Sequence, residues 1–503
     1  MLNLIKVFYL LIIPIFVTPF SLEMLNTKPT IKPVEHEIHV TTKIELKSPF
    51  SKIDGVFSQI GSNPKKKYHG NKPYNWFDSD GMIHAVFFNK THVTYVNRWV
   101  RTKRYITEEK WKQKLYLNFG DLKGFHGIIH IIKWMILNHF SIIPSNSCGT
   151  ANTAFLSWNK VIYALNECDL PYKINYNMTS HDITTSHKID IEGLNSVSAH
   201  PKIDVNRNKL YLYGYNTKDF KKGEFYHNIL DENMNLTSNT NFSMLNNGMV
   251  HDIAQTKNKL IVPDLPLKYD FSNIIHNKLP LQFDRNGTSR LGVIDKDIPD
   301  KIDWYYLEKS IYIFHFSYSY EEKEKIIVFA CIMKDVNMDN LLSPNEELTE
   351  NGKLRLQKII INTKTNKVTI HKNNYIEKID TLTKKNIKYN LDFPISSKVY
   401  KNHIYCSIFD INTGRICGIT CINTMNFESE KPYVYILKNK YITSEPQCIV
   451  IDNKEYLICF TNDDKLSSIT LIDVLNKKHY SLSLSNDTIV TPGLHSIFQY
   501  SND

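Results

Sequence analysis

Short apolar runs separated by turns recur along most of this chain and constrain its fold more than any other feature. Val, Ile, Tyr and Phe dominate the runs, and Asn, Asp and Gly lie between them, which is typical of β-strands. Many short strands between turns predict an all-β sandwich, barrel or propeller. Because no strict repeat is present, the pattern predicts no number of blades. The clearest runs are residues 209–215, 259–263, 310–320, 325–331, 358–363, 402–409, 455–460 and 468–474.

Four histidines, His200, His251, His315 and His495, lie far apart in this pattern. None is near a Cys or another His at the spacing of a metal finger, so only a fold that brings distant strand ends to one axis could gather them. Gathered, they would form an all-imidazole site without an anionic ligand. Imidazole suits Fe, Zn and Cu, and an Fe(II) site with open positions is typical of O₂ chemistry. A lone His is more often a surface or core residue, so the sequence around these four decides their interpretation.

That surrounding sequence contains short motifs. They read Gly-Ser-Asn-Pro-Lys at 61–65, Asn-Trp-Phe-Asp-Ser-Asp-Gly-Met-Ile-His-Ala-Val at 75–86, Tyr-Val-Asn-Arg-Trp-Val-Arg-Thr at 95–102, Phe-Gly-Asp-Leu-Lys-Gly-Phe at 119–125, Gly-Thr-Ala-Asn-Thr-Ala at 149–154, Ala-Leu-Asn-Glu-Cys-Asp-Leu-Pro-Tyr at 164–172, Arg-Leu-Gly-Val at 290–293, Asp-Phe-Pro at 392–394 and Ser-Glu-Pro at 444–446. In this order, with the four histidines, the series resembles the carotenoid cleavage oxygenase (retinal pigment epithelial membrane protein) family. It is most similar to the plant-type carotenoid 9,10(9′,10′)-cleavage dioxygenases.

The resemblance implies a fold. It predicts a seven-bladed β-propeller over residues 33–500, with helices and loops capping the face that carries the metal. A length of 503 residues would suggest several domains, but barrels and propellers often run long as one.

The resemblance also implies a site. The four histidines would bind Fe(2+), and Glu167, Asp392 and Glu445 would orient their rings by hydrogen bonds. Thr153 would shield one of two vacant metal positions with its methyl group. Asp392 departs from the Glu of many family members, and Gln59 stands where an Arg is common. Ser79 replaces a Gly of the family motif, and residues 317–320 also differ, but no departure removes a proposed ligand.

The resemblance further implies an iron-dependent dioxygenase that cleaves a double bond of a carotenoid or apocarotenoid, with a hydrophobic polyene and O₂ as its partners and two carbonyl fragments as products. The sequence contains no Gly-x-Gly-x-x-Gly, P-loop or Gly-x-Ser-x-Gly motif that would favour another chemistry. Alternatives within the same fold are a retinoid isomerohydrolase-like or stilbene-cleaving enzyme. The alternative from a different class is a non-catalytic lipid-binding propeller.

Residues 125–140 differ from the strand pattern, because their apolar residues recur at helical spacing. One interpretation is a helix packed on the core. The other, favoured by the family resemblance, is an interfacial helix that contacts membranes at the substrate entrance. The apolar positions are Phe125, Ile128, Ile129, Ile132 and Ile136, and His126, His130 and Lys133 fall on the other side.

The net charge of +10 and the pI of 8.9 come largely from scattered Lys residues. This distribution predicts mild attraction to anionic membrane surfaces and argues against nucleic acid as a partner. The eight Cys form no Cys-x-x-Cys motif, so buried free thiols are expected rather than a disulfide framework.

The N-terminus carries an apolar run at residues 7–17 that follows Lys6. The run is shorter than the roughly 20 residues of a spanning helix and has the proportions of a signal-peptide core. We therefore expect a signal peptide or other targeting segment at 1–21 and a linker at 22–32. The expected destination is the secretory pathway or a plastid-type organelle, peripheral to a membrane; an uncleaved anchor and a cytoplasmic location are the alternatives.

Overall fold

The computed structural model describes residues 33–43, 46–65, 77–89, 91–144, 149–216, 222–338, 352–382, 388–485 and 488–501. The chain divides into a segment Met1–Thr30 and a compact unit Ile31–Asp503, and every described residue belongs to the second. The expected targeting segment at 1–21 and linker at 22–32 therefore lie outside the described residues.

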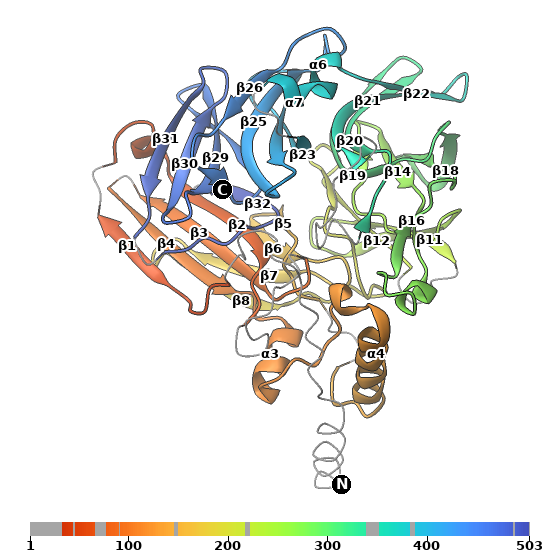
Figure 1. Cartoon of the computed structure of the whole chain (residues 1–503), viewed down its shortest axis with the longest axis horizontal. Coiled ribbons are helices and arrows are strands. Elements are labelled where there is room, and N and C mark those ends of the chain that lie inside the picture. The colour runs from red at the N-terminus through yellow and green to blue at the C-terminus, as the bar shows by residue number, and fades with distance from the viewer. Residues whose placement is uncertain are drawn as a thin grey trace. The chain divides into compact units, whose positions relative to one another are not determined.

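The strands of this unit form antiparallel sheets that lie around a common centre (Figure 1). Four of the sheets are single four-stranded blades. Their strands are β5 (Ala154–Trp158), β6 (Val161–Leu165), β7 (Tyr172–Asn177) and β8 (Asp182–Lys188); β9 (Lys202–Asp204), β10 (Lys209–Tyr215), β11 (Gly223–Leu230) and β12 (Leu236–Met244); β13 (Ala254–Gln255), β14 (Lys259–Asp264), β17 (Arg290–Asp295) and β18 (Ile298–Tyr306); and β19 (Tyr312–Glu322), β20 (Lys325–Met333), β21 (Arg355–Asn362) and β22 (Lys367–His371).

A nine-stranded sheet combines two further blades. The first comprises β23 (Tyr389–Ser396), β24 (His403–Asp410), β25 (Arg415–Asn423) and β26 (Tyr433–Ile436). The second comprises β28 (Gln447–Ile451), β29 (Lys454–Asn462), β30 (Ser467–Asp473) and β31 (Lys478–Ser483). The two-residue strand β27 (Tyr441–Ile442) pairs with β25 and β29 and so connects them.

The remaining blade joins both ends of the domain. It contains β1 (His39–Lys43), β2 (Gly55–Ser62), β3 (Gly81–Asn89), β4 (His92–Trp99) and the C-terminal strand β32 (Ser496–Tyr500), which pairs with β2. A two-stranded sheet of β15 (Leu267–Tyr269) and β16 (Leu281–Phe283) is additional to the blades. The described residues thus contain seven blades, and the prediction of an all-β propeller is confirmed.

Strands that are buried on both faces explain why the sequence predicted many strands clearly. In β20 every residue after Lys325 is buried, so the strand reads as a continuous apolar run rather than an alternating one. The expected run at 325–331 lies inside β20, and the run at 209–215 coincides with β10.

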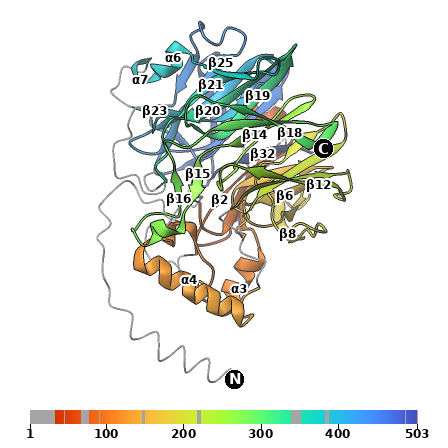
Figure 2. The same ribbon diagram turned by 90° about the vertical axis from the view of Figure 1, so that its right-hand side faces the viewer.

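Two helices, α3 (Lys103–Trp111) and α4 (Gly124–His139), lie together at one side of the propeller (Figures 1 and 2). Thr102 caps α3 by accepting a hydrogen bond from the amide of Tyr105 at 3.0 Å. Leu137 anchors the inner side of α4, whereas much of its outer side is exposed. No helix among the described residues is long and apolar enough to cross a membrane. The short helices are η2 (Phe50–Lys52), η3 (Phe119–Asp121), η4 (Phe271–Ile274), α6 (Asn374–Glu377) and α7 (Ile379–Leu382).

Candidate metal centre

The propeller brings His200, His251, His315 and His495 together. They come from four different blades, because they lie just before β9, just before β13, within β19 and just before β32. Their candidate ligand nitrogens all lie within 4.8 Å of one another. We call this group the four-histidine centre.

The spacing of the nitrogens suits a single metal ion. The Nε2 atom of His251 lies 3.1 Å from that of His200 and 3.3 Å from that of His315. Metal–imidazole bonds of about 2.0–2.1 Å place cis ligands about 3 Å apart and trans ligands about 4 Å apart. The donor set therefore fits one ion bound by imidazole nitrogens alone.

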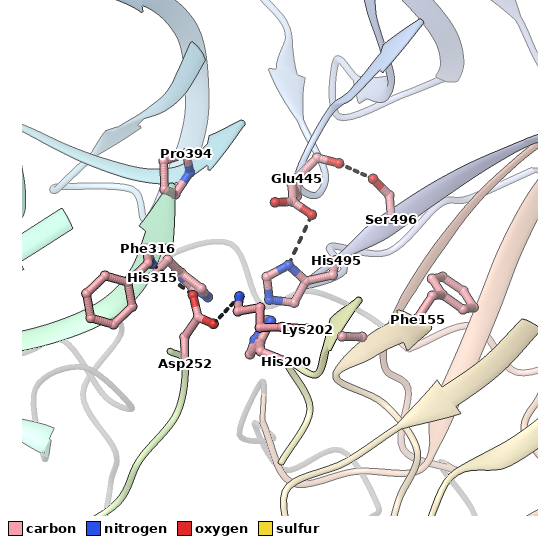
Figure 3. A pocket seen from close by; sticks show the side chains of 11 residues that line it. Phe155, His200, Lys202, Asp252, His315, Phe316, Pro394, Glu445, His495 and Ser496 are labelled. Carbon is pink, nitrogen blue, oxygen red and sulfur yellow. Dashed lines mark hydrogen bonds and ion pairs between the residues drawn. The ribbon is translucent and has the colours of Figure 1, made fainter. Parts of the chain in front are cut away.

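Carboxylates hold three of the four rings. The Nδ1 atom of His251 lies 2.8 Å from Oε1 of Glu167, and that of His315 lies 2.8 Å from Oδ1 of Asp392. The Nδ1 atom of His495 lies 3.1 Å from Oε2 of Glu445 (Figure 3). An Nδ1–H that donates to a carboxylate leaves the Nε2 lone pair free, and it fixes the orientation of the ring. The three carboxylates thus contact the rings from outside the cluster.

Irregular backbone positions one of these pairs. The register of β19 shifts between Ile313 and Phe316, where His315 lies, and that of β23 shifts between Asp392 and Ile395. Phe393 adopts a positive φ of 50° within the second irregularity. Bulges redirect side chains and are frequent beside active sites. Here the two irregular strands present the short Asp392 side chain to His315.

Close backbone packing positions His495. A Cβ atom on Gly61 would lie 2.5 Å from Cα of Gly493, so the two glycines allow the segment before β32 to approach β2. The amide of Ile60 then donates to the carbonyl of His495 at 2.9 Å, and that of Leu494 donates to the carbonyl of Ile60 at 2.8 Å.

The environment favours neutral rings at two of the four positions. Burial, together with the neighbouring imidazoles and Lys202, holds the pKa of His200 well below its usual value. Burial also lowers the pKa of His495, although Glu445 opposes it. For His315, burial would lower the pKa, but the Asp392 carboxylate outweighs it and the pKa is raised. Because metal ligands must be deprotonated, an ion would displace any proton from His315.

Thr153 is buried at the start of β5. Its amide donates to the carbonyl of Leu165 at 3.1 Å, and its hydroxyl donates to Oδ1 of Asn152 at 3.0 Å. The Asn152 amide is itself held by Ser62 Oγ at 2.8 Å. These bonds turn the hydroxyl toward Asn152, while the role of the methyl group as a metal shield stays a prediction.

A cavity of about 210 Å³ adjoins the centre (Figure 3). Lys202 reaches into it and donates to Oδ1 of Asp252 at 2.6 Å, while the amide of Phe316 donates to Oδ2 of Asp252 at 2.8 Å. Both carboxylate oxygens of Asp252 therefore accept hydrogen bonds from these donors. The cavity is lined by Ala154, Phe155, His200, Lys202, Asp252, His315, Phe316, Pro394, Glu445, His495 and Ser496.

Lys202 and Asp252 were not predicted from the sequence as neighbours of the centre. A signal was present, because Lys202 follows His200 by two residues and Asp252 follows His251 directly. Their pairing across two blades, however, depends on the fold.

Comparison with known proteins gives consistent matches. The family described as retinal pigment epithelial membrane protein matches residues 31–499. The carotenoid 9,10(9′,10′)-cleavage dioxygenase 1 of Phaseolus vulgaris is 27% identical over 385 residues, which cover 75% of this chain and 67% of that protein.

Solved structures share the fold at lower identity. The Pseudomonas brassicacearum lignostilbene dioxygenase is 17% identical, with a TM-score of 0.73 over 95% of this chain and 100% of that chain. A cobalt-substituted Synechocystis apocarotenoid oxygenase is 16% identical, with a TM-score of 0.72 over 94% and 98%.

Proposed function

The chain belongs to the retinal pigment epithelial membrane protein family, the carotenoid cleavage oxygenases, and from this premise we propose that it is a non-haem Fe(II)-dependent dioxygenase. Its proposed reaction is cleavage of one double bond of a carotenoid or apocarotenoid by O₂. Each carbon of that bond would receive one oxygen atom, which gives two aldehyde or ketone fragments.

The observation that carries the proposal is the four-histidine centre. The Nε2 atom of His251 lies at the separation of cis ligands from those of His200 and His315, and the carboxylates contact the rings at Nδ1. One solved structure of this fold is described as a cobalt-substituted oxygenase, which is consistent with a metal-dependent reaction. Bound Fe(II) would activate O₂ beside the polyene, and the electrons that reduce O₂ would come from the double bond that is cleaved.

The residues of the chain have separate proposed roles. The four histidines bind the ion as neutral ligands, which leaves its positive charge undiminished. Glu167, Asp392 and Glu445 keep three rings in the Nδ1–H tautomer, so that the Nε2 lone pairs face the ion without rearrangement. Thr153 lies one residue before the cavity-lining Ala154 and would restrict access to one metal position.

We propose that α4 attaches the enzyme to membranes, where a lipid-soluble substrate is found. Five residues along α4 and its C-terminal end form an exposed stripe, of which Phe125 is 71% exposed and Ile132 and Ile136 are each 51% exposed. Large exposed apolar patches mark membrane or protein contacts more often than isolated exposed residues do. The exposed stripe comprises Phe125, Ile129, Ile132, Ile136 and Phe140.

The fold alone does not select the substrate, because a lignostilbene dioxygenase and an apocarotenoid oxygenase superpose equally well. Incubation of iron-loaded protein with a panel of carotenoids, apocarotenals and hydroxylated stilbenes, followed by mass spectrometry, tests the proposal. Two carbonyl fragments from a polyene support it. Fragments from stilbenes only would assign the stilbene-cleaving alternative. Isomerised or unchanged polyene would assign the isomerohydrolase-like or binding-protein alternative.

The cellular location of the protein stays a prediction, which is based on its N-terminal segment. Fusion of residues 1–32 to a fluorescent reporter separates the secretory pathway, a plastid-type organelle and the cytoplasm.

A further inference from the structure

A second pair of histidines lies on the surface of α4, away from the four-histidine centre. His126 and His130 are one helical turn apart, and their Nε2 atoms lie 3.1 Å from each other. Their ring centroids are 4.5 Å apart and their planes are nearly perpendicular, at 81°. His126 is exposed and His130 is half-buried. The two Nε2 atoms therefore face each other at hydrogen-bonding distance, at a place that solvent can reach.

From this geometry we propose that His126 and His130 form a second metal site, which binds a late divalent transition ion such as Cu²⁺, Ni²⁺ or Zn²⁺. With metal–nitrogen bonds of about 2.0–2.1 Å, a nitrogen separation of 3.1 Å corresponds to an angle of about 100° at the ion. This lies between the angles of octahedral or square-planar and tetrahedral coordination, and imidazole is a preferred ligand of all three ions. Water molecules complete the coordination, because one side of the pair is open.

The surroundings keep the pair available for a metal. Burial and the neighbouring His126 lower the pKa of His130, so its ligand form is present at neutral pH. Lys114 forms an ion pair with Asp121 at 2.5 Å, and Lys133 donates to the carbonyl of Lys114 at 3.4 Å. Both ammonium groups thus have oxygen partners of their own.

The same surroundings limit the affinity of the pair. Lys114 and Lys133 are cations near His130, and the first turns of a helix disfavour a cation. Two ligands also hold an ion less tightly than four. We therefore expect an exchangeable site that fills when metal is supplied, whereas the four-histidine centre retains its ion through purification.

Because His126 and His130 lie one turn apart, an ion bound between them would also affect the stability of α4. Residues four apart face each other on a helix, so an ion bridging His126 and His130 fastens the first two turns of α4. These turns carry Phe125 and Ile129 of the exposed stripe. The bound ion would lie along one flank of that stripe.

The test is a titration of the iron-loaded full-length chain with ZnCl₂, followed by calorimetry, with metal analysis after gel filtration in buffer that contains the same concentration of free ZnCl₂. The parent protein should bind one equivalent of Zn²⁺ in addition to its iron. The His126→Gln and His130→Gln proteins should each lose that equivalent and keep their iron. The matched control is His139→Gln, because His139 is an exposed histidine on the same helix and no second histidine lies one turn away.

A second readout identifies the residues directly. Modification of histidines by diethyl pyrocarbonate, mapped by mass spectrometry, should slow at His126 and His130 when Zn²⁺ is added and should not change at His139. The proposal is overturned if the parent binds no zinc beyond the centre. It is also overturned if the two single variants bind as the parent does, or if the His139→Gln protein loses the same equivalent. The iron content is read separately, so failure here leaves the four-histidine centre unaffected.

Discussion

The four-histidine centre and helix α4 reverse the usual distribution of polarity in opposite ways. The centre places polar, titratable rings inside the propeller, whereas α4 places large apolar side chains in solvent. A buried polar group or an exposed apolar patch is more informative than a buried Leu, because each costs stability without a compensating partner. In the centre the partners are visible as carboxylates. On α4 the proposed partner is a membrane.

The four-histidine centre and the pair of His126 and His130 also differ in how their rings are held. The centre needs four blades to assemble its ligands, and carboxylates orient three of its rings. The pair of His126 and His130 needs only one helix, and no carboxylate hydrogen bond to either ring is found among the described residues. Preorganisation should therefore make the first site tight and the second exchangeable.

The largest expected effect is the loss of iron from the centre. Substitution of His315 by Ala removes one of the four proposed ligands and leaves Asp392 without its hydrogen-bond partner, so we expect no stoichiometric iron and activity near background. Metal analysis of the purified variant measures the loss, and circular dichroism checks its fold. Liposome binding should be unchanged, because α4 is not altered. Full iron retention would remove His315 from the ligand set.

The second-largest expected effect is a loss of membrane binding that leaves the metal content of the centre unchanged. Replacement of Ile129, Ile132 and Ile136 by Ser should release the protein from liposomes and leave its iron in place. Burial of a large apolar side chain contributes about 1.5–3 kcal/mol, so three partly exposed ones should weaken attachment by roughly 2–4 kcal/mol, on the order of 30- to 1,000-fold.

A matched triple variant controls for the loss of exposed apolar area in general. Val205, Ile298 and Ile489 are likewise exposed and lie outside α4, so their replacement by Ser should leave liposome binding unchanged. If the α4 variant sediments with liposomes as the parent does, the exposed stripe is not the membrane contact.

Removal of a carboxylate should have an intermediate effect. Glu167→Gln and Asp392→Asn keep the side-chain size but remove the charge, and such changes typically cost 10- to 100-fold in metal affinity or activity. The Asp392→Glu protein keeps the charge and should lose less than Asp392→Asn. Glu192→Gln, at an exposed position, is the control. Equal iron affinity in Glu167→Gln, Glu192→Gln and the parent would argue against the orienting role.

The smallest expected effect is a pH dependence of metal uptake. The pKa of His315 is raised by Asp392 in the metal-free protein, so protonation stabilises the folded metal-free form at low pH and this contribution is lost as the pH rises through that pKa. Iron must displace the proton, so its apparent affinity should rise with pH by up to about tenfold per unit below that pKa. The Asp392→Asn protein should show this rise at lower pH. An unchanged profile would mean that another group titrates.

The sequence predicted the architecture better than the local geometry of the site. Buried strands such as β20 are continuous apolar runs of β-branched and aromatic residues, so their presence can be predicted without tertiary information, although the expected run at 325–331 ends before β20 does at Met333. The four histidines were selected only through the resemblance of the motifs around them, since spacing alone does not distinguish them among 19 His. The irregularities at His315 and Asp392 depend on how neighbouring strands pair and have no local signal.

Helix α4 shows the same limit of prediction from the sequence. Its apolar spacing predicted which residues share a side, but not whether that side faces the core or solvent. That choice depends on what the rest of the fold places against the helix, here η4 on its inner side and nothing among the described residues over Phe125 or Ile132. Lys202 and Asp252 were missed for a related reason, because their contact exists only once two blades meet.

The most direct test of the dioxygenase proposal is cleavage of a polyene by the iron-loaded protein under ¹⁸O₂ in unlabelled water. Products are analysed within the first turnovers, before exchange of carbonyl oxygen with water. We expect one ¹⁸O atom in each of the two carbonyl fragments, and no cleavage by the metal-free protein or by the His315→Ala variant. Label in only one fragment, or fragments whose oxygen comes from water, would contradict the account.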